Sequence, residues 1–509
     1  MRPLFKKTGI QAGQVALHTI LKLRRPLPAT QSFVVSGARR TRETGVYTEE
    51  YYPPQYLPEE TLIGHLKFAL KHEPLDLGTL YETFEAIGPT PLEAWLRGEP
   101  TGSFSRRAWF LYEFLTGRTL DIEDARSGNY VMALDEKRHF GAAPLNSARH
   151  RVRDNLLGPR ELCPTLRRTP KLEAMLSIGL SAEAVGLTAQ YAPETLARAV
   201  NFLYKKETRS SFAIEGEAPN RNREERFLQA LHSASSFTTH KSALIDLQTG
   251  IVDARYAAQD WRDLQNFVGE TTRGFGEYVH FICPRPADVP SLMRGWAALT
   301  ERVLSGRVEP VLAAAVCAFS FVFVHPFEDG NGRIHRFLIH YALARGRFGP
   351  PELVLPVSAA ILRQIHLYDQ TLEAFSKPIM AGIEWEFTPD NEIIVENDTS
   401  SLYRYFDATV QAEYLYDRVA EAIREDFKEE LEFLHIYDAA LASVLSLIDM
   451  PNRRAALLVK LCLQNGGRLS QNKRSQFAEI TEEELRQVEA AIHPLIRPTD
   501  EQEEAGRSV

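Results

Sequence analysis

The sequence is poor in cysteine, with four cysteines among 509 residues. They lie far apart, at Cys163, Cys283, Cys317 and Cys462, and no two of them form a CxxC pair. A zinc ribbon and a disulfide framework are therefore not expected. Reduced thiols in a cytosol-like compartment are the simpler interpretation, which predicts a cytoplasmic protein.

Long hydrophobic runs are also lacking. The longest uncharged run, from Pro310 to Phe327, has 18 residues, and its apolar part from Val311 to Val324 has 14. That length is short for a membrane span and normal for a buried helix. No apolar stretch opens the chain, so neither a secretory signal nor a membrane partner is expected.

The chain as a whole has no excess of positive charge. It holds 59 Lys and Arg against 67 Asp and Glu, a net charge of −8. This balance argues against a generic nucleic-acid coat protein, because phosphate binding favours a basic surface. Residues 1–42 are an exception, with nine Arg or Lys and no Asp or Glu. We expect a flexible basic arm over residues 1–45, with a nucleic-acid arm and an organelle transit peptide as alternatives.

The rest of the chain predicts a mainly α protein without internal repeats. We expect a mostly helical N-terminal domain, a core domain, a helical C-terminal domain and a disordered acidic tail, at residues 46–165, 170–385, 386–498 and 499–509. Pro193 is a good first-turn residue for a long helix. Residues 265–270 and 277–282 can pair as a β-hairpin.

The C-terminal domain contains a unit at residues 455–492 that reads as helix-turn-helix. Gly466 and Gly467 mark its turn, and Thr481 with Glu484 forms a capping box for its last helix. Its charged residues sum to zero, so a packing or docking module is favoured over DNA binding. Nucleic acid is therefore not an expected partner, although a nucleic-acid-binding regulator stays an alternative.

A loop of 12 residues, HPFEDGNGRIHR, directly follows the apolar run. Gly330, Asn331 and Gly332 tolerate positive φ, so the turn can aim consecutive backbone N–H groups at an anion. A helix that begins near Gly332 adds the partial positive charge of its N-terminus. Arg333 and Arg336 share a face of that helix, so two guanidinium groups can grip a polyphosphate.

Two more residues of this loop supply the remaining parts of a phosphate-transfer site. Asp329 stands at the rim and can hold Mg²⁺, which prefers a carboxylate together with phosphate oxygens. His325 can take a proton from a hydroxyl near neutral pH. A buried core histidine beside an ordinary turn is the alternative for any one residue. The combination indicates nucleotide phosphate chemistry on a hydroxyl substrate.

The loop resembles the Fic motif, HPFx(D/E)GNGRxxR, without departure, and the resemblance extends over roughly residues 190–380. It implies a helical core with a β-hairpin flap at about 265–283. It also implies transfer of AMP from ATP, with Mg²⁺, to a Tyr, Ser or Thr hydroxyl of a target protein docked on residues 277–282. The implied roles are base for His325, metal ligand for Asp329, loop anchor for Phe327, and phosphate binding for Gly330, Asn331, Gly332, Arg333 and Arg336.

Gly332 bears on the type of reaction. The kinase-like Doc branch of the family has a Lys at this place and transfers the γ-phosphate, so Gly332 favours nucleotidyl transfer. Other phosphodiester donors, such as the CDP-choline used by a minority of the family, stay open.

Upstream, the stretch SFAIEG from Ser211 to Gly216 resembles the family's inhibitory motif, (S/T)xxxE(G/N). Ser211 and Glu215 are four residues apart and share a helix face; an ordinary solvated face is the alternative. The resemblance implies an inhibitory helix at about 205–217, in which Glu215 pairs with Arg336 and leaves ATP out of line for attack. An enzyme that removes AMP, or that both adds and removes it, is one alternative function, and a non-catalytic scaffold is another.

The adenine pocket follows less directly from the resemblance. The family places a Tyr and an Asn in a stretch that resembles Ser358 to Tyr368, and this chain has Ala360 and Gln364 at those places. Gln364 can donate and accept along a base edge, so Gln364 and Tyr368 are the candidates. A surface glutamine and a core tyrosine are the alternatives. Assembly of the chain into a homo-oligomer is also compatible with the sequence.

Overall fold

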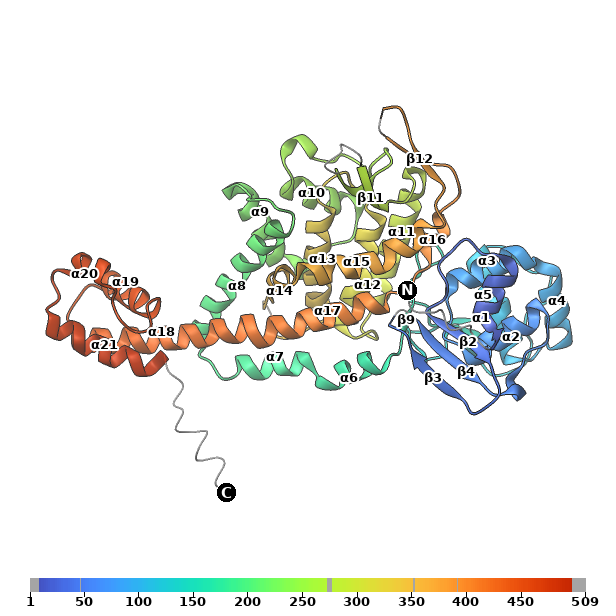
Figure 1. The fold of residues 1–509 in the computed structure, drawn as a ribbon, viewed down its shortest axis with the longest axis horizontal. Helices are drawn as coiled ribbons and strands as arrows, with labels where there is room; N and C mark the ends of the chain where they lie inside the picture. Colours follow the sequence, from blue (N-terminus) through green and yellow to red (C-terminus); the bar gives the residue numbers. More distant parts are fainter. Residues whose placement is uncertain (1–8, 46, 272–276, 351–352, 391, 497–509) are drawn as a thin grey trace, which may run out of the picture.

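The computed structural model describes residues 9–45, 47–271, 277–350, 353–390 and 392–496. The molecule is elongated, with an N-terminal domain at one end, a helical core in the middle and a small helical bundle at the other end (Figure 1). The prediction of a mainly α protein is confirmed. No helix among the described residues is long and apolar enough to cross a membrane. The predicted acidic tail and the first eight residues of the predicted arm lie outside the described residues.

The N-terminal domain combines a mixed sheet with a group of helices. The sheet has the strand order β1-β2-β4-β3, in which β2 and β4 are parallel and the other neighbours are antiparallel. Its strands are β1 (Ile10–Ala12), β2 (Thr30–Val34), β3 (Arg40–Glu43) and β4 (Thr48–Tyr52). The helices are α1 (Gly13–Leu21), α2 (Leu62–His72), α3 (Leu77–Ile87), α4 (Pro89–Gly98) and α5 (Ser103–Thr116).

The prediction of a flexible arm is wrong for residues 9–45. Val15 and Leu17 of α1 are 1% and 0% exposed, so the helix is part of a hydrophobic core. The basic side chain of Arg25 is buried as well, 3.5 Å from Asp76 and donating a hydrogen bond to the Tyr405 carbonyl. The acidic and carbonyl partners of this basic segment come from distant parts of the chain, which its local composition does not reveal.

Short strands connect the N-terminal helices to the core, so the expected mostly helical domain is less helical than predicted. They form a sheet in the order β5-β8-β7 and a separate pair, β6-β9. The strands are β5 (Val131–Met132), β6 (His139–Phe140), β7 (Leu145–Ser147), β8 (Val152–Asp154) and β9 (Leu166–Arg167). Strands of two or three residues are too short for an alternating pattern to mark them in the sequence.

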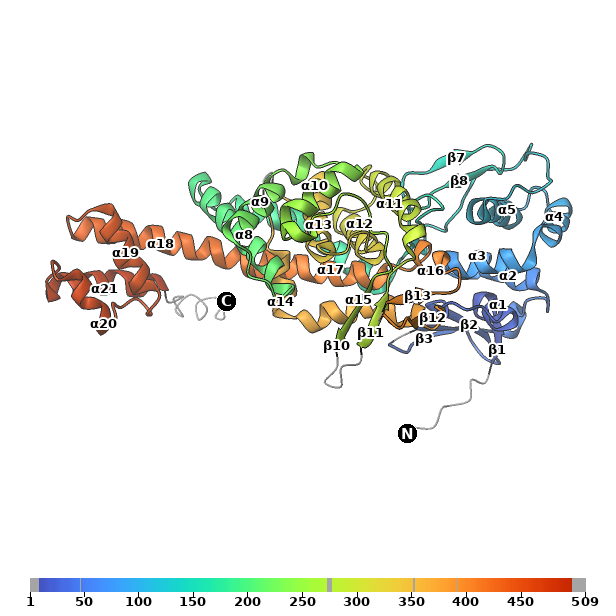
Figure 2. The ribbon, with the colours of Figure 1, turned by 90° about the horizontal axis from the view of Figure 1, so that it is seen from above.

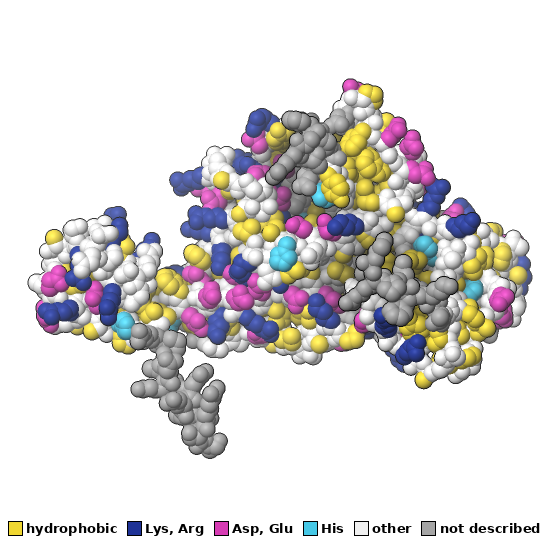
Figure 3. Space-filling model, in the orientation of Figure 1, with side chains coloured by type: hydrophobic (Ala, Val, Ile, Leu, Met, Phe, Trp, Pro, Cys, Tyr) yellow, Lys and Arg dark blue, Asp and Glu magenta, His cyan; other side chains and the backbone are white. Residues whose placement is uncertain are grey.

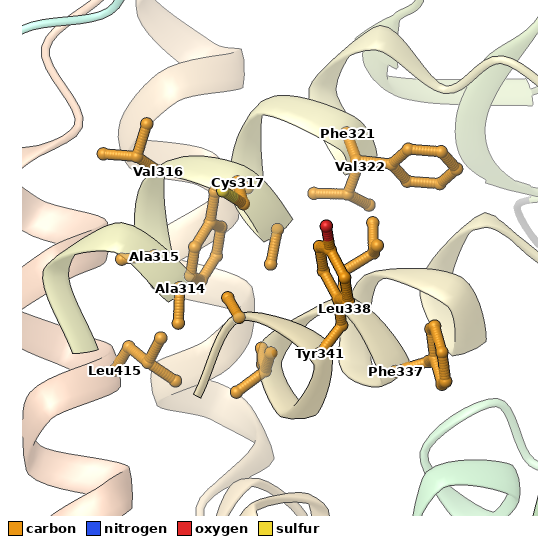
Figure 4. Packing of buried hydrophobic residues seen from close by; sticks show 14 of the residues in the cluster. Ala314, Ala315, Val316, Cys317, Phe321, Val322, Phe337, Leu338, Tyr341 and Leu415 are labelled. Atoms are coloured by element: carbon orange, nitrogen blue, oxygen red, sulfur yellow. The ribbon is translucent and has the colours of Figure 1, made fainter. Parts of the chain in front are cut away.

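The core is built around α12 (Pro310–Val324) and α13 (Asn331–Arg345), which pack against each other (Figure 4). All side chains of α12 from Val311 to Val324 are buried, as the apolar run predicts. Leu415 of a later helix completes the packing. The helices around this pair are α6 (Pro170–Ile178), α7 (Leu180–Thr188), α8 (Pro193–Ile214), α9 (Arg221–His232), α10 (Lys241–Ile251), α11 (Val289–Val303), α14 (Val357–Arg363) and α15 (Ile365–Met380).

Two antiparallel hairpins stand at one edge of the core (Figure 2). The first pairs β10 (Phe267–Thr271) with β11 (Glu277–Ile282), which confirms the hairpin expected from the sequence; its turn lies outside the described residues. The second pairs β12 (Trp385–Phe387) with β13 (Ile393–Val395).

The C-terminal helices do not begin a new domain at residue 386, as the sequence suggested. Helices α16 (Ser400–Arg404) and α17 (Thr409–Glu421) pack on the core, where Leu415 and Val419 are 0% exposed. A π-helical segment, Ala422–Phe427, joins α17 to α18 (Lys428–Leu447), so one long helical rod runs from the core into the distal bundle (Figure 1). The buried side chains of this rod belong to the central core at one end and to the distal bundle at the other.

The distal bundle consists of α19 (Asn452–Leu463), α20 (Gln471–Arg474) and α21 (Glu482–Ile496), packed on the end of α18. The capping box is confirmed: Glu484 N–H donates to Thr481 Oγ1 at 3.2 Å, and Thr481 N–H donates to Glu484 Oε2 at 2.8 Å.

Candidate active site

The loop between α12 and α13 is held in shape by its own residues. Helix α12 ends at Val324; the next residue, His325, has a left-handed φ of 52°, and Gly330 has a φ of 90°. The Asn331 side chain donates to the Phe327 carbonyl at 2.7 Å and accepts from Phe327 N–H at 3.1 Å. Phe327 is 0% exposed. The side chain of Asn331 therefore fixes the loop, and only its backbone is left to face a ligand.

In the His325 ring, one nitrogen carries a proton and the other has a free lone pair. Its Nδ1 lies 3.2 Å from the Val322 carbonyl; since a carbonyl can only accept, Nδ1 carries the proton and Nε2 has the free lone pair. Removal from water and the nearby Arg262 guanidinium lower the pKa of His325 to about 4. The ring is therefore neutral near pH 7. Arg262 also donates to the His325 carbonyl at 2.7 Å, which fixes the backbone of the residue.

Arg336 is engaged by the end of α8. Its Nη2 donates to Glu215 Oε1 at 2.7 Å and to the Ser211 carbonyl at 2.8 Å, and its Nε donates to Ser211 Oγ at 2.9 Å. The Arg336 side chain is 1% exposed and that of Glu215 is 36% exposed. Burial opposes ionisation of Glu215, but the pairing with Arg336 outweighs it and the pKa of the carboxyl is lowered. The structure thus brings together the three residues that the sequence proposed as an inhibitory contact.

Glu215 also lies against Gly332. A Cβ built on Gly332 would collide with Glu215 Oε1. Gly332 is in the first turn of α13, where backbone N–H groups have no partner within the helix and the helix dipole is positive. The carboxylate therefore lies beside the first turn of α13.

Arg333 is held by two carboxylates. Its Nη2 donates to Asp329 Oδ1 at 2.7 Å, and its Nη1 donates to Glu217 Oε2 at 3.2 Å and to the Ile251 carbonyl at 3.1 Å. The Arg333 side chain is 1% exposed. Glu217 was not singled out from the sequence, because the inhibitory motif ends at Gly216. The acidic residue two positions after Glu215 is the signal that could have found it.

Gly216 forms the turn between Glu215 and Glu217. It has a φ of 68°, and Glu217 N–H donates back to the Phe212 carbonyl at 3.1 Å. This is a C-terminal helix cap that places Glu215 and Glu217 on the side of α13.

Two buried donors in this region have no partner among the described residues, namely Arg333 Nε and Arg336 Nη1. Buried guanidinium N–H groups are normally hydrogen-bonded, and phosphate oxygens are suitable acceptors. Asp329 is 40% exposed at the rim, with Oδ1 also accepting from Gly330 N–H at 2.5 Å. The described residues contain no group of three or more His, Cys, Asp or Glu side chains that could hold a metal ion. A cation bound to Asp329 would thus take its other oxygen ligands from nucleotide and water, as Mg²⁺ does.

The two adenine candidates differ in their surroundings. Tyr368 is 5% exposed, interacts with Arg336, and has its pKa raised to about 12, mainly by burial. Its ring lies 5.9 Å from that of His335. Gln364 stands between α14 and α15 and is partly exposed. The structure therefore brings Tyr368 to the arginine side of the site, while no contact ties Gln364 to the motif residues within the described chain.

The first hairpin borders the site, and the second supports it. Asn266 donates to the Glu328 carbonyl at 3.4 Å, beside the motif loop. Phe267 of β10 meets Phe387 of β12 edge to face at 6.2 Å. Hydrophobic side chains gather on the surface around β11 and β12 (Figure 3). The exposed apolar residues of the two hairpins are Val268 (43%), Tyr278 (55%) and Ile394 (49%).

Comparison with known proteins finds Fic similarity in the middle of the chain, where the sequence motif lies. Residues 237–343 match the family described as Fic/DOC. A stretch of 75 residues is 36% identical to protein adenylyltransferase Fic of Drosophila melanogaster, covering 15% of each chain. A stretch of 96 residues is 33% identical to protein adenylyltransferase fic-1 of Caenorhabditis elegans, covering 19% of this chain and 16% of the relative.

The similarity to these relatives spans less than a fifth of their length. Among solved structures, a Fic domain containing signaling protein from Bacteroides thetaiotaomicron is 17% identical with a TM-score of 0.36, covering 52% of this chain and 97% of that one. The family match begins at residue 237, so the segment with Ser211 and Glu215 lies outside it.

Proposed function

We propose that this chain, which carries a Fic domain at residues 237–343, transfers AMP from ATP to a Tyr, Ser or Thr hydroxyl of a target protein. The observation that carries the proposal is the arrangement around the motif loop. A neutral histidine with a free Nε2, an exposed carboxylate and two buried arginines surround the N-terminus of one helix. The relatives named protein adenylyltransferase support the same reaction.

In the proposed reaction the target hydroxyl oxygen attacks the α-phosphorus of ATP. His325 Nε2 takes the hydroxyl proton as the new P–O bond forms. The bond between the α-phosphorus and the bridging oxygen breaks, and pyrophosphate leaves. The N–H groups of the first turn of α13 with Gly330, Asn331 and Gly332, together with the two buried guanidiniums, bind the phosphates and stabilise the charge that develops on them.

Asp329 is the residue that would hold Mg²⁺. Bound there with phosphate oxygens, the ion would neutralise phosphate charge and assist pyrophosphate departure. To take this role, Asp329 can use Oδ2, because its hydrogen bonds from Arg333 and Gly330 both go to Oδ1. The target segment is proposed to dock along β11, by strand pairing with residues 277–282.

The described conformation is proposed to be inhibited. Glu215 neutralises Arg336 and covers Gly332, so the terminal phosphate of ATP has neither its guanidinium partner nor free access to the helix terminus. ATP can bind around this contact with its α-phosphate out of line, a misplacement that costs several kcal/mol of barrier.

Transfer of label from ATP to protein tests the reaction. Wild type, Glu215→Gly, and Glu215→Gly with His325→Ala are incubated with Mg²⁺ and a cell lysate, with label on the α-phosphate in one set and on the γ-phosphate in another. We expect α-label on protein, strong in Glu215→Gly and lost in the double variant. Label from the γ-phosphate would mean a kinase-like reaction. No label in any sample would contradict ATP-dependent transfer and favour a scaffold.

Removal of AMP is a second candidate function, because the ionised Glu215 acts electrostatically on His325. In such a reaction Glu215 would orient or deprotonate a water molecule for attack on the AMP–protein bond. A target labelled with AMP by Glu215→Gly is purified and given to wild type. Release of AMP by wild type, and none by Glu215→Gly, would assign this activity.

A further inference from the structure

The motif arginines belong to two neighbouring sets of ion pairs, together called the charge network, which extend beyond Glu215. Arg336 pairs with Glu215, and Arg333 pairs with both Asp329 and Glu217. Glu217 Oε2 also accepts from Arg223 Nη2 of α9 at 2.6 Å. Three arginines and three carboxylates therefore balance one another around the first turn of α13.

We propose that Glu217 is a second inhibitory residue, which restrains Arg333 as Glu215 restrains Arg336. This inference rests on the proposed function, since it concerns the regulation of the same nucleotide site. Glu217 lies outside both sequence motifs, and its displacement would release the charge of the Arg333 guanidinium.

Contacts at both terminal nitrogens and over one face restrain the Arg333 guanidinium. Nη1 faces Glu217 and the Ile251 carbonyl, Nη2 faces Asp329, and the Phe212 ring lies 5.5 Å from its central carbon. Its Nε is buried without a partner among the described residues. A phosphate that binds Arg333 through Nη1 must therefore displace the Glu217 carboxylate or compete with its charge.

Charge balance shows why one substitution leaves the site partly closed. The network sums to zero, and His325 is neutral at pH 7 because burial lowers its pKa to about 4. ATP with one Mg²⁺ carries a charge of roughly −2. Loss of Glu215 leaves one positive charge uncompensated. Loss of Glu217 as well leaves two, and the buried Arg262 guanidinium beside His325 adds a further positive charge, so each lost carboxylate makes the site more attractive to the anionic nucleotide.

Glu215 and Glu217 are close enough in the chain to be displaced from the arginines together. Both lie in the turn after α8, on either side of Gly216. The body of α8 is anchored by buried Glu207, which accepts from His340 Nε2 at 2.7 Å and from Ser358 N–H at 2.8 Å. A movement confined to residues 215–217 can thus withdraw both carboxylates from the arginines without detaching the helix, while Arg336 keeps its hydrogen bonds to Ser211. Arg223 places this turn in contact with α9, so a partner that displaces α9 would reach the same switch.

The test combines nucleotide binding with transfer of label. The full-length proteins are Glu215→Gly, Glu217→Gln, the double variant, and the double variant with Arg333→Gln. Binding of a fluorescent ATP analogue with Mg²⁺ is measured by anisotropy, and transfer is measured from α-labelled ATP. Glu225→Gln is the control, because that carboxylate pairs with exposed Arg221 away from the site.

We expect Glu217→Gln to tighten nucleotide binding about tenfold in the Glu215→Gly background and to raise transfer as well. The gain should vanish when Arg333 is also replaced, and Glu225→Gln should change neither quantity. Unchanged or weaker binding in the double variant would overturn the proposal, since it would mean that Glu217 is neutral or holds Arg333 in its productive position.

Glu217→Asp covers the case in which Glu217→Gln does not fold. It keeps the charge but shortens the side chain, so nucleotide binding in the Glu215→Gly background is expected to be tighter than with Glu217 retained, by less than with Glu217→Gln. Unchanged binding counts against the proposal. Glu217→Gln could tighten nucleotide binding although no variant transfers label. In that case the adenylyl-transfer proposal fails, and the proposal that Glu217 restrains Arg333 is supported.

Discussion

Arg336 Nη2 donates a hydrogen bond to Glu215 Oε1 at 2.7 Å, and this contact joins the end of α8 to the first turns of α13. The two residues are 121 positions apart. The same carboxylate lies against Gly332. Glu215 thus combines two effects, neutralisation of a guanidinium and obstruction of a helix terminus, and each can be tested separately.

Replacement of Glu215 by glutamine and by glycine separates charge from bulk. Gln keeps nearly the same volume beside Gly332 but leaves Arg336 uncompensated, whereas Gly removes both effects. We expect label transfer to rise in both variants, by more than about tenfold in Glu215→Gly and by less in Glu215→Gln. Equal activation would contradict the obstruction, and no activation in Glu215→Gln would contradict the role of charge.

The pH dependence of the activated enzyme reports the state of His325. A base works in its deprotonated form, so activity is lost as the pH falls through its pKa. Burial and Arg262 lower the pKa of His325 to about 4, and Glu215 raises it, so removal of Glu215 lowers it further. The kcat/KM of Glu215→Gly should therefore be flat between about pH 5 and 8. An acid limb centred near 6.5, the ordinary histidine value, would refute this environment.

Asp329→Asn should raise the Mg²⁺ concentration that label transfer needs. Asn can still accept the hydrogen bonds from Arg333 and Gly330 but carries no charge for the cation. In the Glu215→Gly background we expect the Mg²⁺ concentration for half-maximal transfer to rise about tenfold. Glu328→Gln is the matched control, because Glu328 is the exposed neighbouring acid. The same Mg²⁺ dependence in both variants would remove Asp329 from the metal site.

The flap should affect the target and not the nucleotide. Tyr278 on β11 is 55% exposed, so Tyr278→Ala costs little stability. In the Glu215→Gly background we expect labelling of lysate proteins to fall about tenfold while binding of the ATP analogue is unchanged. Leu145→Ala, at an exposed site of the N-terminal domain, serves as control. Loss of nucleotide binding in Tyr278→Ala would contradict a docking role.

Glu207→Leu should destabilise the core strongly. Glu207 is 0% exposed, and its removal leaves His340 Nε2, Ser358 N–H and Ser358 Oγ without their acceptor. We expect a cost of about 3 kcal/mol, seen as a fall of the calorimetric midpoint by roughly 10 °C. Lys205→Ala, exposed on the same helix, should shift it by less than about 2 °C. A small shift in Glu207→Leu would mean that α8 is not anchored at this point.

Local sequence pattern is sufficient to determine several elements. The apolar run predicts α12, Pro193 marks the start of α8, and Thr481 with Glu484 marks the start of α21. Each depends on neighbours within one or two turns, so the information is local. The motif loop belongs to the same class, since the residues that shape it are His325 to Arg336 themselves.

Contacts between distant segments decided the rest. The basic segment is not a free arm because Val15 and Leu17 are buried in a hydrophobic core and Arg25 meets Asp76 and the Tyr405 carbonyl. The expected boundary at residue 386 disappears because α17 packs on α12.

The sequence alone determined the chemistry of the loop, by placing a histidine, a carboxylate, glycines and two arginines at fixed spacing. Only the tertiary structure decided that Glu217 faces Arg333, that His325 is kept neutral, and that Tyr368 lies beside Arg336. The physical reason is that hydrogen bonds, burial and charge pairing depend on distance in space. The packing of α8 against α13 brings residues that are far apart in the chain within hydrogen-bonding distance of each other.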